Sequence, residues 1–238
     1  KSIHEPYTVG DFERDAIKLL KDLFKKHDVV ILVGGSNLYT DAVVNGLDVF
    51  PEVPEKIKHH WQQAFEQKGI EFLQNELQRL DPTYHSNVDL QNHVRLLRAL
   101  GVCTASGKPY SSFLGQPKRA RNFDVVSIEI TMCREKLYSR INSRVDSMIA
   151  KGLVEEVQRL LPHKNLNALQ TVGYRELFPY LEEKQPLEAC IENIKKNTRR
   201  FAKRQLTWLR NHSCVYQIPY DTIIDDALFK KLGLKKLV

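Results

Sequence analysis

The aliphatic run at residues 28–33 (DVVILV) constrains the fold of this 238-residue chain more than any other segment. Its continuous apolar character predicts a strand buried on both faces, as in a parallel sheet covered by helices. The GGS turn at 34–36 leads into a predicted helix at 37–45. An amphipathic pattern at 11–27, with Asp11 as N-cap, predicts a helix before the run. Helix, strand, turn and helix in this order indicate an α/β sheet.

The pattern of the residues after position 50 predicts a helical insertion followed by the remainder of the core. Residues 51–80 are polar and rich in Lys, Gln and Glu, with Trp61, Phe65, Phe72 and Leu73 as their apolar stripe. The other elements expected from periodicity are a helix at 89–100, a strand at 123–130, two helices within 132–161 that break at Lys151-Gly152, a helix at 187–212 and a strand at 214–218.

These elements divide the chain into three parts. Residues 1–50 are expected to form the first part of an α/β core, 51–100 a mainly helical insertion, and 101–238 the second part of the core, including a long basic helix. No apolar run reaches the roughly 20 residues that span a membrane, and no signal peptide precedes the amphipathic start. We therefore expect a cytosolic protein without a membrane partner.

Charge and cysteine content narrow the functional classes. A net charge of +7 suits a polyanionic partner, although many basic proteins bind no nucleic acid. The four cysteines, at positions 103, 133, 190 and 214, lack the short paired spacing of structural zinc sites. They are expected to be buried, reduced thiols.

The GGS turn is the first candidate site. Gly34 and Gly35 let the backbone approach an oxyanion closely, the following helix supplies free N–H groups, and the Ser36 hydroxyl adds a donor. This arrangement suits phosphate or diphosphate. The alternative is a sharp turn between packed elements, and spacing alone does not separate the two interpretations.

The segment 101–109 (GVCTASGKP) only superficially resembles a phosphate-binding loop. Five residues separate Gly101 from Gly107 where the motif has four, and Pro109 follows Lys108 where the motif has Ser or Thr. A surface loop at the end of a helix is expected here. A complete ATPase or kinase is therefore hard to support.

The helix at 187–212 carries the main electrostatic argument. Glu192 is its only acidic residue between Ile191 and His212, against seven Lys or Arg. This excess favours contact with a phosphate backbone over a merely solvated face. At about 100° per residue, the cations Lys196, Arg199, Arg200, Lys203 and Arg210 lie opposite the apolar Ile191, Ile194, Phe201, Ala202, Trp208 and Leu209.

Two further groups of cations are weaker candidates. Arg175 lies near a predicted helix start and is suited to anion binding through its planar fork. Pairing with Glu176 or Glu182 is the alternative. Arg95 and Arg98, three residues apart on one helix, form another exposed pair.

Several stretches, in order, resemble the tRNA dimethylallyltransferase (tRNA isopentenyltransferase) family. They are YTVGDFERDA, VILVGGSNLYTDAVVNGL, VRLLRAL, QTVGYRELFPYL and NTRRFAKRQLTWLR, and they cover nearly the whole chain. The resemblance implies a P-loop-like α/β core with a helical insertion that grips the anticodon arm. It argues against a P-loop-fold kinase relative.

The resemblance also implies the chemistry. In this family the exocyclic amine of the adenosine 3′ to the anticodon attacks dimethylallyl diphosphate, and diphosphate leaves with help from magnesium. By position, Gly34, Gly35 and Ser36 bind the diphosphate, and Ser36 and Arg175 act in catalysis. Ser36 stands where the family usually has threonine, so the hydroxyl is kept and the methyl is lost.

Further positions carried over from the family are tRNA contacts, and a monomer is expected. The implied contacts are Lys58, Val94, Arg95, Leu96, Leu97, Arg98, Gln170, Thr171, Val172, Gly173, Tyr174, Arg175, Lys203, Arg204, Gln205, Leu206, Thr207, Trp208, Leu209 and Arg210.

The family opens with a strand, a true phosphate-binding loop and an aspartate proposed as general base. These features, with the main magnesium-binding segment, precede the YTVGDFERDA stretch and have no counterpart in this chain. We therefore expect the core to be incomplete at the N-terminus and the chain alone to be inactive in transfer. A noncatalytic tRNA-binding homologue is the alternative.

Overall fold

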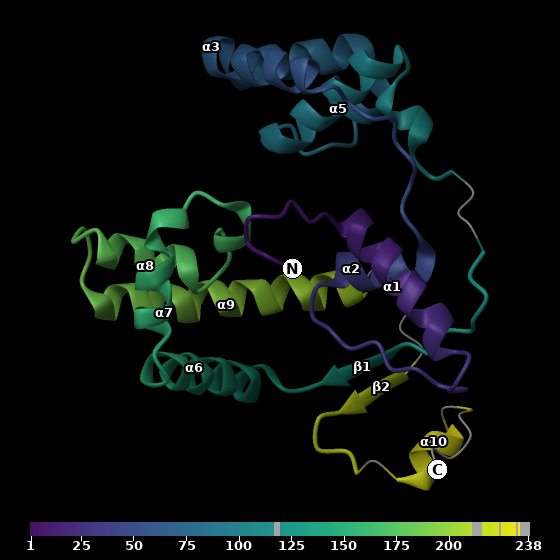
Figure 1. Ribbon diagram of the computed structural model, residues 1–238, viewed down its shortest axis with the longest axis vertical. Coiled ribbons are helices and arrows are strands. Elements are labelled where there is room, and N and C mark those ends of the chain that lie inside the picture. The colour runs from purple at the N-terminus through teal and green to yellow at the C-terminus, as the bar shows by residue number, and fades with distance from the viewer. Residues whose placement is uncertain (117–119, 211–215, 224, 232, 234–238) are drawn as a thin grey trace. The chain divides into compact units, whose positions relative to one another are not determined.

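The computed structural model describes residues 1–116, 120–210, 216–223, 225–231 and 233. Figure 1 traces its helices and strands. The chain forms two compact units, residues 1–44 with 122–238 (unit 1) and residues 45–121 (unit 2). The sequence predicts an insertion at 51–100, whereas the compact helical unit runs from 45 to 121.

Unit 1 contains a two-stranded sheet and a series of helices. Its elements are α1 (Val9–Leu23), α2 (Asn37–Asn45), β1 (Ile128–Thr131), α6 (Arg134–Ala150), α7 (Leu153–Leu160), η2 (Leu161–His163), η3 (Asn167–Leu169), α8 (Tyr174–Leu181), α9 (Leu187–Arg210), β2 (Tyr216–Pro219) and α10 (Asp226–Lys231).

The sheet pairs β1 with β2 in parallel, with Ile128 opposite Tyr216 and Thr131 opposite Pro219. Helices α6 to α9 connect the two strands, because parallel neighbours need a long crossover. This arrangement agrees with the predicted α/β class. β1 begins later than the predicted strand at 123–130, and β2 extends one residue past the predicted strand at 214–218, of which residues 214 and 215 lie outside the described residues.

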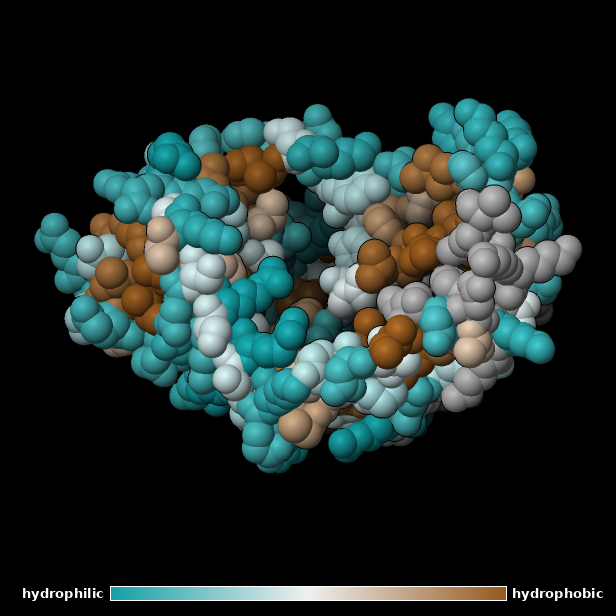
Figure 2. All heavy atoms as spheres, turned by 90° about the horizontal axis from the view of Figure 1, so that it is seen from below, coloured by the Kyte–Doolittle hydropathy of each residue, from teal (hydrophilic) through white to brown (hydrophobic). Residues whose placement is uncertain are grey.

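The prediction of a buried strand at 28–33 is wrong for the described structure. The segment has no regular secondary structure, and the side chains of Ile31 and Val33 are 75% and 88% exposed. A strand needs a neighbour for its backbone hydrogen bonds. In the described part of the chain, the sheet consists of β1 and β2 alone. Ile130 of β1 is also largely exposed, and Figure 2 shows hydrophobic residues at the surface among hydrophilic ones.

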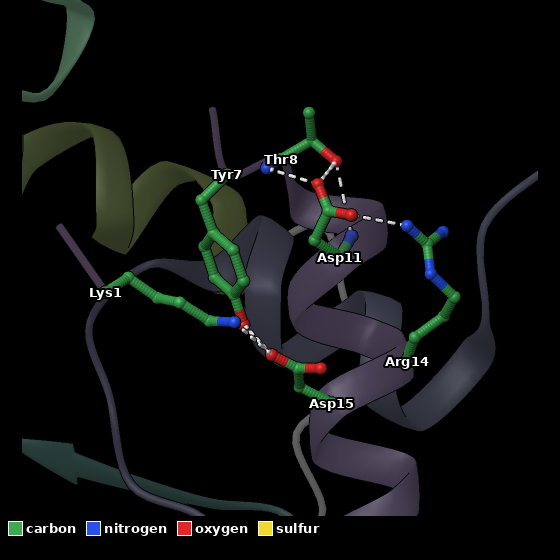
Figure 3. A network of polar contacts seen from close by, with 6 residues as sticks. All are labelled: Lys1, Tyr7, Thr8, Asp11, Arg14 and Asp15. Atoms are coloured by element: carbon green, nitrogen blue, oxygen red, sulfur yellow. Dashed lines mark hydrogen bonds and ion pairs between the residues drawn. The ribbon is translucent and has the colours of Figure 1, made fainter. Parts of the chain in front are cut away.

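Helix α1 begins at Val9 because Thr8 and Asp11 form a capping box. Thr8 Oγ1 accepts a hydrogen bond from the Asp11 N–H at 3.2 Å, and Asp11 Oδ2 accepts one from the Thr8 N–H at 2.8 Å. Asp11 is therefore the third helical residue, and its prediction as N-cap is wrong. Figure 3 shows this cap with the neighbouring contacts of Lys1, Tyr7, Arg14 and Asp15.

The core of unit 1 is formed by four helices. Val145 of α6, Val157 of α7, Leu177 of α8 and Ile194 of α9 are buried in one cluster. The break between α6 and α7 falls at Gly152, whose φ of +94° is a conformation that favours glycine. The two predicted helices and the glycine break are therefore confirmed, and this cluster holds α8 and α9 in position.

Unit 2 is helical, as predicted for residues 51–80. Its elements are α3 (Glu55–Leu80), α4 (Pro82–His85), α5 (His93–Ser106) and η1 (Tyr110–Phe113). Trp61 and Leu73 are buried against α5, while Phe65 and Phe72 are partly buried at the edge of the same core. The predicted apolar stripe is therefore confirmed.

The expectation of a surface loop at 101–109 is largely wrong. Gly101, Val102 and Cys103 are buried within α5, which ends at Gly107 in a left-handed conformation. The apolar spacing of VRLLRAL continues for two further turns, and the glycine that ends the helix is the second of the pair.

The described cysteines are free thiols. Cys103 and Cys190 are buried as expected, and burial raises the pKa of both thiols. Cys133 is exposed, so the expectation of burial is wrong there. Cys214 lies outside the described residues. No helix in the described ranges combines the length and apolar character needed to cross a membrane.

Candidate functional site

The GGS turn enters α2 as predicted and contacts α9. The Ser36 carbonyl accepts hydrogen bonds from the N–H groups of Tyr39 (2.8 Å) and Thr40 (3.3 Å), which closes the first turn of α2. Gln205 Nε2 of α9 donates a hydrogen bond to the Gly35 carbonyl. Ser36 is exposed, and no partner for its hydroxyl occurs among the described residues. The hydroxyl is thus free to donate to a ligand.

A side chain at position 35 would meet Gln205 of α9. A Cβ atom there would lie 2.5 Å from Gln205 Nε2, so the α9 side chain would have to move. Asn37 Nδ2 also donates to the Gln205 carbonyl at 3.4 Å. The turn therefore both packs closely and presents an open hydroxyl, and the two interpretations of the GGS sequence are compatible.

Arg175 is held by a buried carboxylate. Its Nε lies 2.9 Å from Glu176 Oε1, and the Arg175 side chain is 47% exposed while that of Glu176 is 5% exposed. Glu176 also accepts hydrogen bonds from Asn197 Nδ2 of α9 (2.9 Å) and from the Gly173 N–H (2.7 Å). The alternative pairing of Arg175 with Glu176 is thus realised, while Glu182 binds Lys164 and Lys184 instead.

Pairing with Glu176 does not exclude an anion-binding role for Arg175. Within the described structure, Glu176 engages only the Nε–H of the guanidinium, which carries five N–H donors in all. The ion pair fixes the plane of the fork and leaves its terminal amino groups open. The partial neutralisation by Glu176 weakens the long-range charge but not these directed donors.

Both candidate catalytic residues are positioned by one side of α9. Asn197 fixes the Arg175–Glu176 pair and Gln205 fixes the GGS turn. Eight residues of helix correspond to about 12 Å along the axis. At about 100° per residue, the two side chains lie about 80° apart around the helix. The structure therefore brings the two residues to one side of α9 but to separate points along it.

The cationic face of α9 is exposed only in part. Lys196, Arg200 and Lys203 are exposed as predicted. Arg199 instead donates to Asn142 Oδ1 of α6 at 2.7 Å. Lys195 is paired with Asp146 of α6 at 2.9 Å as well as with Glu192. Counting acidic residues within α9 alone therefore overlooked Asp146 of α6, which neutralises one of the α9 cations.

The apolar face is likewise divided. Ile194 and Ala202 are buried, and Trp208 is half-buried. Phe201, which the sequence places on the apolar face, does not pack in the core: its side chain is 40% exposed and its ring lies 5.5 Å from the Arg204 guanidinium. An aromatic residue at this helical position packs against a cation instead of the core.

Only some of the residues of unit 2 that are expected to contact tRNA have exposed side chains. Arg95 and Arg98 are exposed, and Lys58 is exposed but paired with Glu55 at 2.6 Å. Leu96 is fully buried and Leu97 is packed against the same core. Helical periodicity turns these two leucines inward, and their assignment as RNA contacts stays a prediction. Val94 is 63% exposed.

The expected contacts in the Gln170–Arg175 stretch are mostly tied to neighbouring groups. Gln170 Nε2 donates to the Lys164 carbonyl at 2.6 Å, and the Tyr174 hydroxyl donates to Glu156. This hydrogen bond raises the pKa of Tyr174. Gly173 is buried with a φ of +108°. Thr171 is exposed and Val172 is half-buried.

The remaining expected contacts lie near the C-terminal end of α9. Leu206 and Thr207 are exposed, and Leu209 is half-buried. Arg204 and Arg210 are also exposed. The sequence did not single out Asn197 or Asn142 as positioning residues. Glu176 was named only as a pairing alternative, although its place three residues after Gly173 has the spacing of a capping box.

Comparison with known proteins assigns the family. The family model described as IPP transferase matches residues 1–212. The chain belongs to the IPP transferase family. It is 52% identical over 220 residues to a tRNA dimethylallyltransferase of Christiangramia forsetii, covering 92% of this chain and 73% of that protein. It is 50% identical over 216 residues to the corresponding protein of Flavobacterium psychrophilum, covering 88% and 70%.

Solved structures agree with this IPP transferase assignment. The full-length tRNA isopentenylpyrophosphate transferase of Bacillus halodurans has a TM-score of 0.64 and 31% identity, covering 98% of this chain and 74% of that one. A eukaryotic dimethylallyltransferase acting on tRNA has a TM-score of 0.71 and 26% identity, covering 87% and 54%. The predicted P-loop-like α/β class with its helical insertion is therefore the fold of this IPP transferase.

Metal binding has no support from the side chains alone. In the ranges that the structure describes, no group of three or more His, Cys, Asp and Glu side chains lies close enough to hold a metal ion.

Proposed function

We propose that this IPP transferase is a tRNA dimethylallyltransferase. It transfers the dimethylallyl group of dimethylallyl diphosphate to the exocyclic amine of the adenosine 3′ to the anticodon. The observation that carries the proposal is 52% identity to a tRNA dimethylallyltransferase over nine-tenths of this chain. The similarity to a eukaryotic enzyme acting on tRNA supports the same substrate class.

The reaction exchanges one bond at the allylic carbon for another. The amine nitrogen forms a bond to that carbon, the carbon–oxygen bond to the diphosphate breaks, and the diphosphate leaves with the bonding electron pair. The amine then loses a proton. Negative charge therefore grows on the leaving oxygens, and donors placed around them accelerate the step.

In this proposal the GGS turn receives the diphosphate. The Ser36 hydroxyl is exposed, and the N–H groups at the start of α2 favour an anion. Gln205 supports the turn from behind through the Gly35 carbonyl. The hydroxyl is thereby held where it can donate to an oxygen of the leaving group.

Arg175 supplies the positive charge for the same group. Glu176 fixes the guanidinium through Nε, and its terminal amino groups remain available for two parallel hydrogen bonds to phosphate oxygens. Arg175 therefore acts as a directed donor, and Glu176 acts as a positioning residue. Magnesium, as the family resemblance implies, would further neutralise the diphosphate, but no step here depends on it.

The tRNA is bound through exposed residues of both units. Arg95 and Arg98 of α5 and the exposed cations of α9 are suited to phosphate contacts. The target adenosine must leave its stack for its amine to reach the donor. We expect a monomer. Because its substrate is tRNA, we also expect the protein in the cytoplasm.

The proposal is tested by incubating the full-length protein with labelled dimethylallyl diphosphate and tRNA. The expected product is a dimethylallyl adenosine beside the anticodon, identified by nucleoside mass spectrometry. A tRNA with guanosine at that position is the control and should take no label. Labelling that does not depend on this adenosine would contradict the proposed substrate.

A further inference from the structure

A small pocket of about 50 Å³ lies between the first turns of α6 and the last turns of α9. Arg134 and Tyr138 line it from α6, and Lys203, Thr207 and Arg210 line it from α9, together with two leucines. Residues three or four apart share one face of a helix. The lining therefore comes from one face of each helix, and its volume suits a single small group.

The pocket gathers three positive charges. Arg134, Lys203 and Arg210 form no ion pair with any residue that the structure describes. Other cations of α9 are engaged, since Lys195 pairs with Asp146 and Glu192. Three cations around one pocket repel one another, and this repulsion is relieved when an anion lies between them.

The start of α6 adds to this positive potential. Its N-cap, Cys133, makes no side-chain hydrogen bond to the first turn. The first N–H groups of this 17-residue helix are therefore not capped by that side chain, and the helix dipole places partial positive charge there. Arg134, the first residue of α6, lines the pocket, so both features act at the same place.

This pocket is separate from the GGS turn. Gln205, which contacts the turn, follows Lys203 by two residues and points about 200° around the helix from it. Thr207 and Arg210 lie on the Lys203 side. The donor diphosphate and the pocket therefore lie on opposite sides of α9, and the pocket calls for a different anion.

We propose that the pocket binds one backbone phosphate of the RNA substrate, with Arg134 of α6 as a phosphate-binding residue. Lys196 and Arg200 continue the same exposed face toward the N-terminal end of α9, so a phosphate chain meets further cations beyond the pocket. A backbone phosphate carries one negative charge and matches the size of the pocket. This inference rests on the proposed function, because it takes tRNA as the substrate.

The test compares Arg134→Gln with the wild-type protein in tRNA binding at several salt concentrations. Loss of one phosphate contact should reduce the slope of log affinity against log salt by about 0.7–0.9 and weaken binding about 5- to 10-fold near 0.1 M salt. Arg159→Gln, which removes an exposed arginine from α7, is the matched control and should leave the slope unchanged. Arg134→Lys should restore most of the slope, because the charge is kept.

A second arm separates RNA from diphosphate. Inhibition by inorganic diphosphate and the KM for the prenyl donor should not change in Arg134→Gln. An unchanged salt slope would overturn the proposal, and so would a rise in the donor KM with unchanged RNA binding. Wild-type protein that fails to modify tRNA would instead contradict the proposed function, so the two failures are distinguishable.

Cys133 offers a test that needs no variant. It is exposed and directly precedes Arg134, so RNA in the pocket should slow its alkylation by a neutral maleimide. Peptide mass spectrometry measures modification at this position. An alkylation rate that saturating tRNA leaves unchanged would contradict the proposal even if Arg134→Gln fails to fold.

Discussion

Arg175 and Ser36 are both proposed to act on the leaving diphosphate, but the structure holds them in different ways. Arg175 is fixed by Glu176, a buried carboxylate that accepts hydrogen bonds from three groups on α8, α9 and the turn before α8. Ser36 lies on an exposed turn supported by Gln205. Stability and catalysis are therefore linked around Arg175 and largely separate around Ser36.

The largest expected effect is on the buried side of this comparison. Glu176→Ala leaves the Gly173 N–H buried without its acceptor and releases Arg175 and Asn197. The free energy of unfolding should fall by about 2–4 kcal/mol, measured by urea denaturation, and transfer should fall with it. Glu188→Ala removes an exposed acid from α9 and should stay within about 0.5 kcal/mol. Wild-type stability in Glu176→Ala would mean that the network is not structural.

Ser36→Ala should separate activity from stability. Removing a positioned donor to developing negative charge typically costs about 10²–10³ in kcat. The melting temperature and the tRNA affinity should hardly change, because the side chain is exposed. Ser36→Thr restores the hydroxyl and should recover most of the rate. If kcat at saturating substrates is normal in the alanine variant, the GGS segment is only a turn.

Gln205→Ala tests whether the turn depends on α9. Loss of one hydrogen bond of about 1 kcal/mol should lower kcat/KM for the prenyl donor about 5-fold. Gln158→Ala on α7 removes a comparable exposed amide and should leave that ratio unchanged. An equal loss in both variants would show that the contact between Gln205 and Gly35 does not position the turn.

The smallest expected effect concerns Glu182, the carboxylate that Arg175 does not use. Hydrogen bonds from Lys164 and Lys184 lower the pKa of Glu182 to about 2. Because the folded pKa lies below the unfolded value, the pair stabilises the fold above about pH 4.5 and loses this contribution as the pH falls toward 2. Glu182→Gln should flatten the stability profile over that range, measured by thermal melts. A profile identical to wild type would show that the pair is screened by solvent.

The sequence predicted most of the helices because their apolar spacing is regular. The helix at 37–45, the described part of the helix predicted at 187–212 (Leu187–Arg210), the insertion helix and the break at Gly152 all follow from local patterns. The prediction of a strand at 28–33 failed because strand formation depends on a contact that is not local. A strand forms only where another strand can pair with it, and the residues of the segment itself do not determine whether such a neighbour is present.

The candidate site was predictable only where its residues are local in sequence. Glu176 follows Gly173 at capping-box spacing and directly follows Arg175, so its role at this position could have been predicted from the sequence. Gln205 and Gly35 are 170 residues apart, and no sequence pattern in either segment predicts their contact. Leu96 and Leu97 were included among RNA contacts because a family motif is contiguous, whereas a helix exposes only part of it.

The close approach of Gln205 to Gly35 also limits how these two positions change during evolution. Any residue larger than glycine at 35 would meet the amide of Gln205, so Gln205 must either turn its amide away from the turn or be replaced by a shorter side chain. Two segments at opposite ends of the chain are thereby expected to vary as a pair.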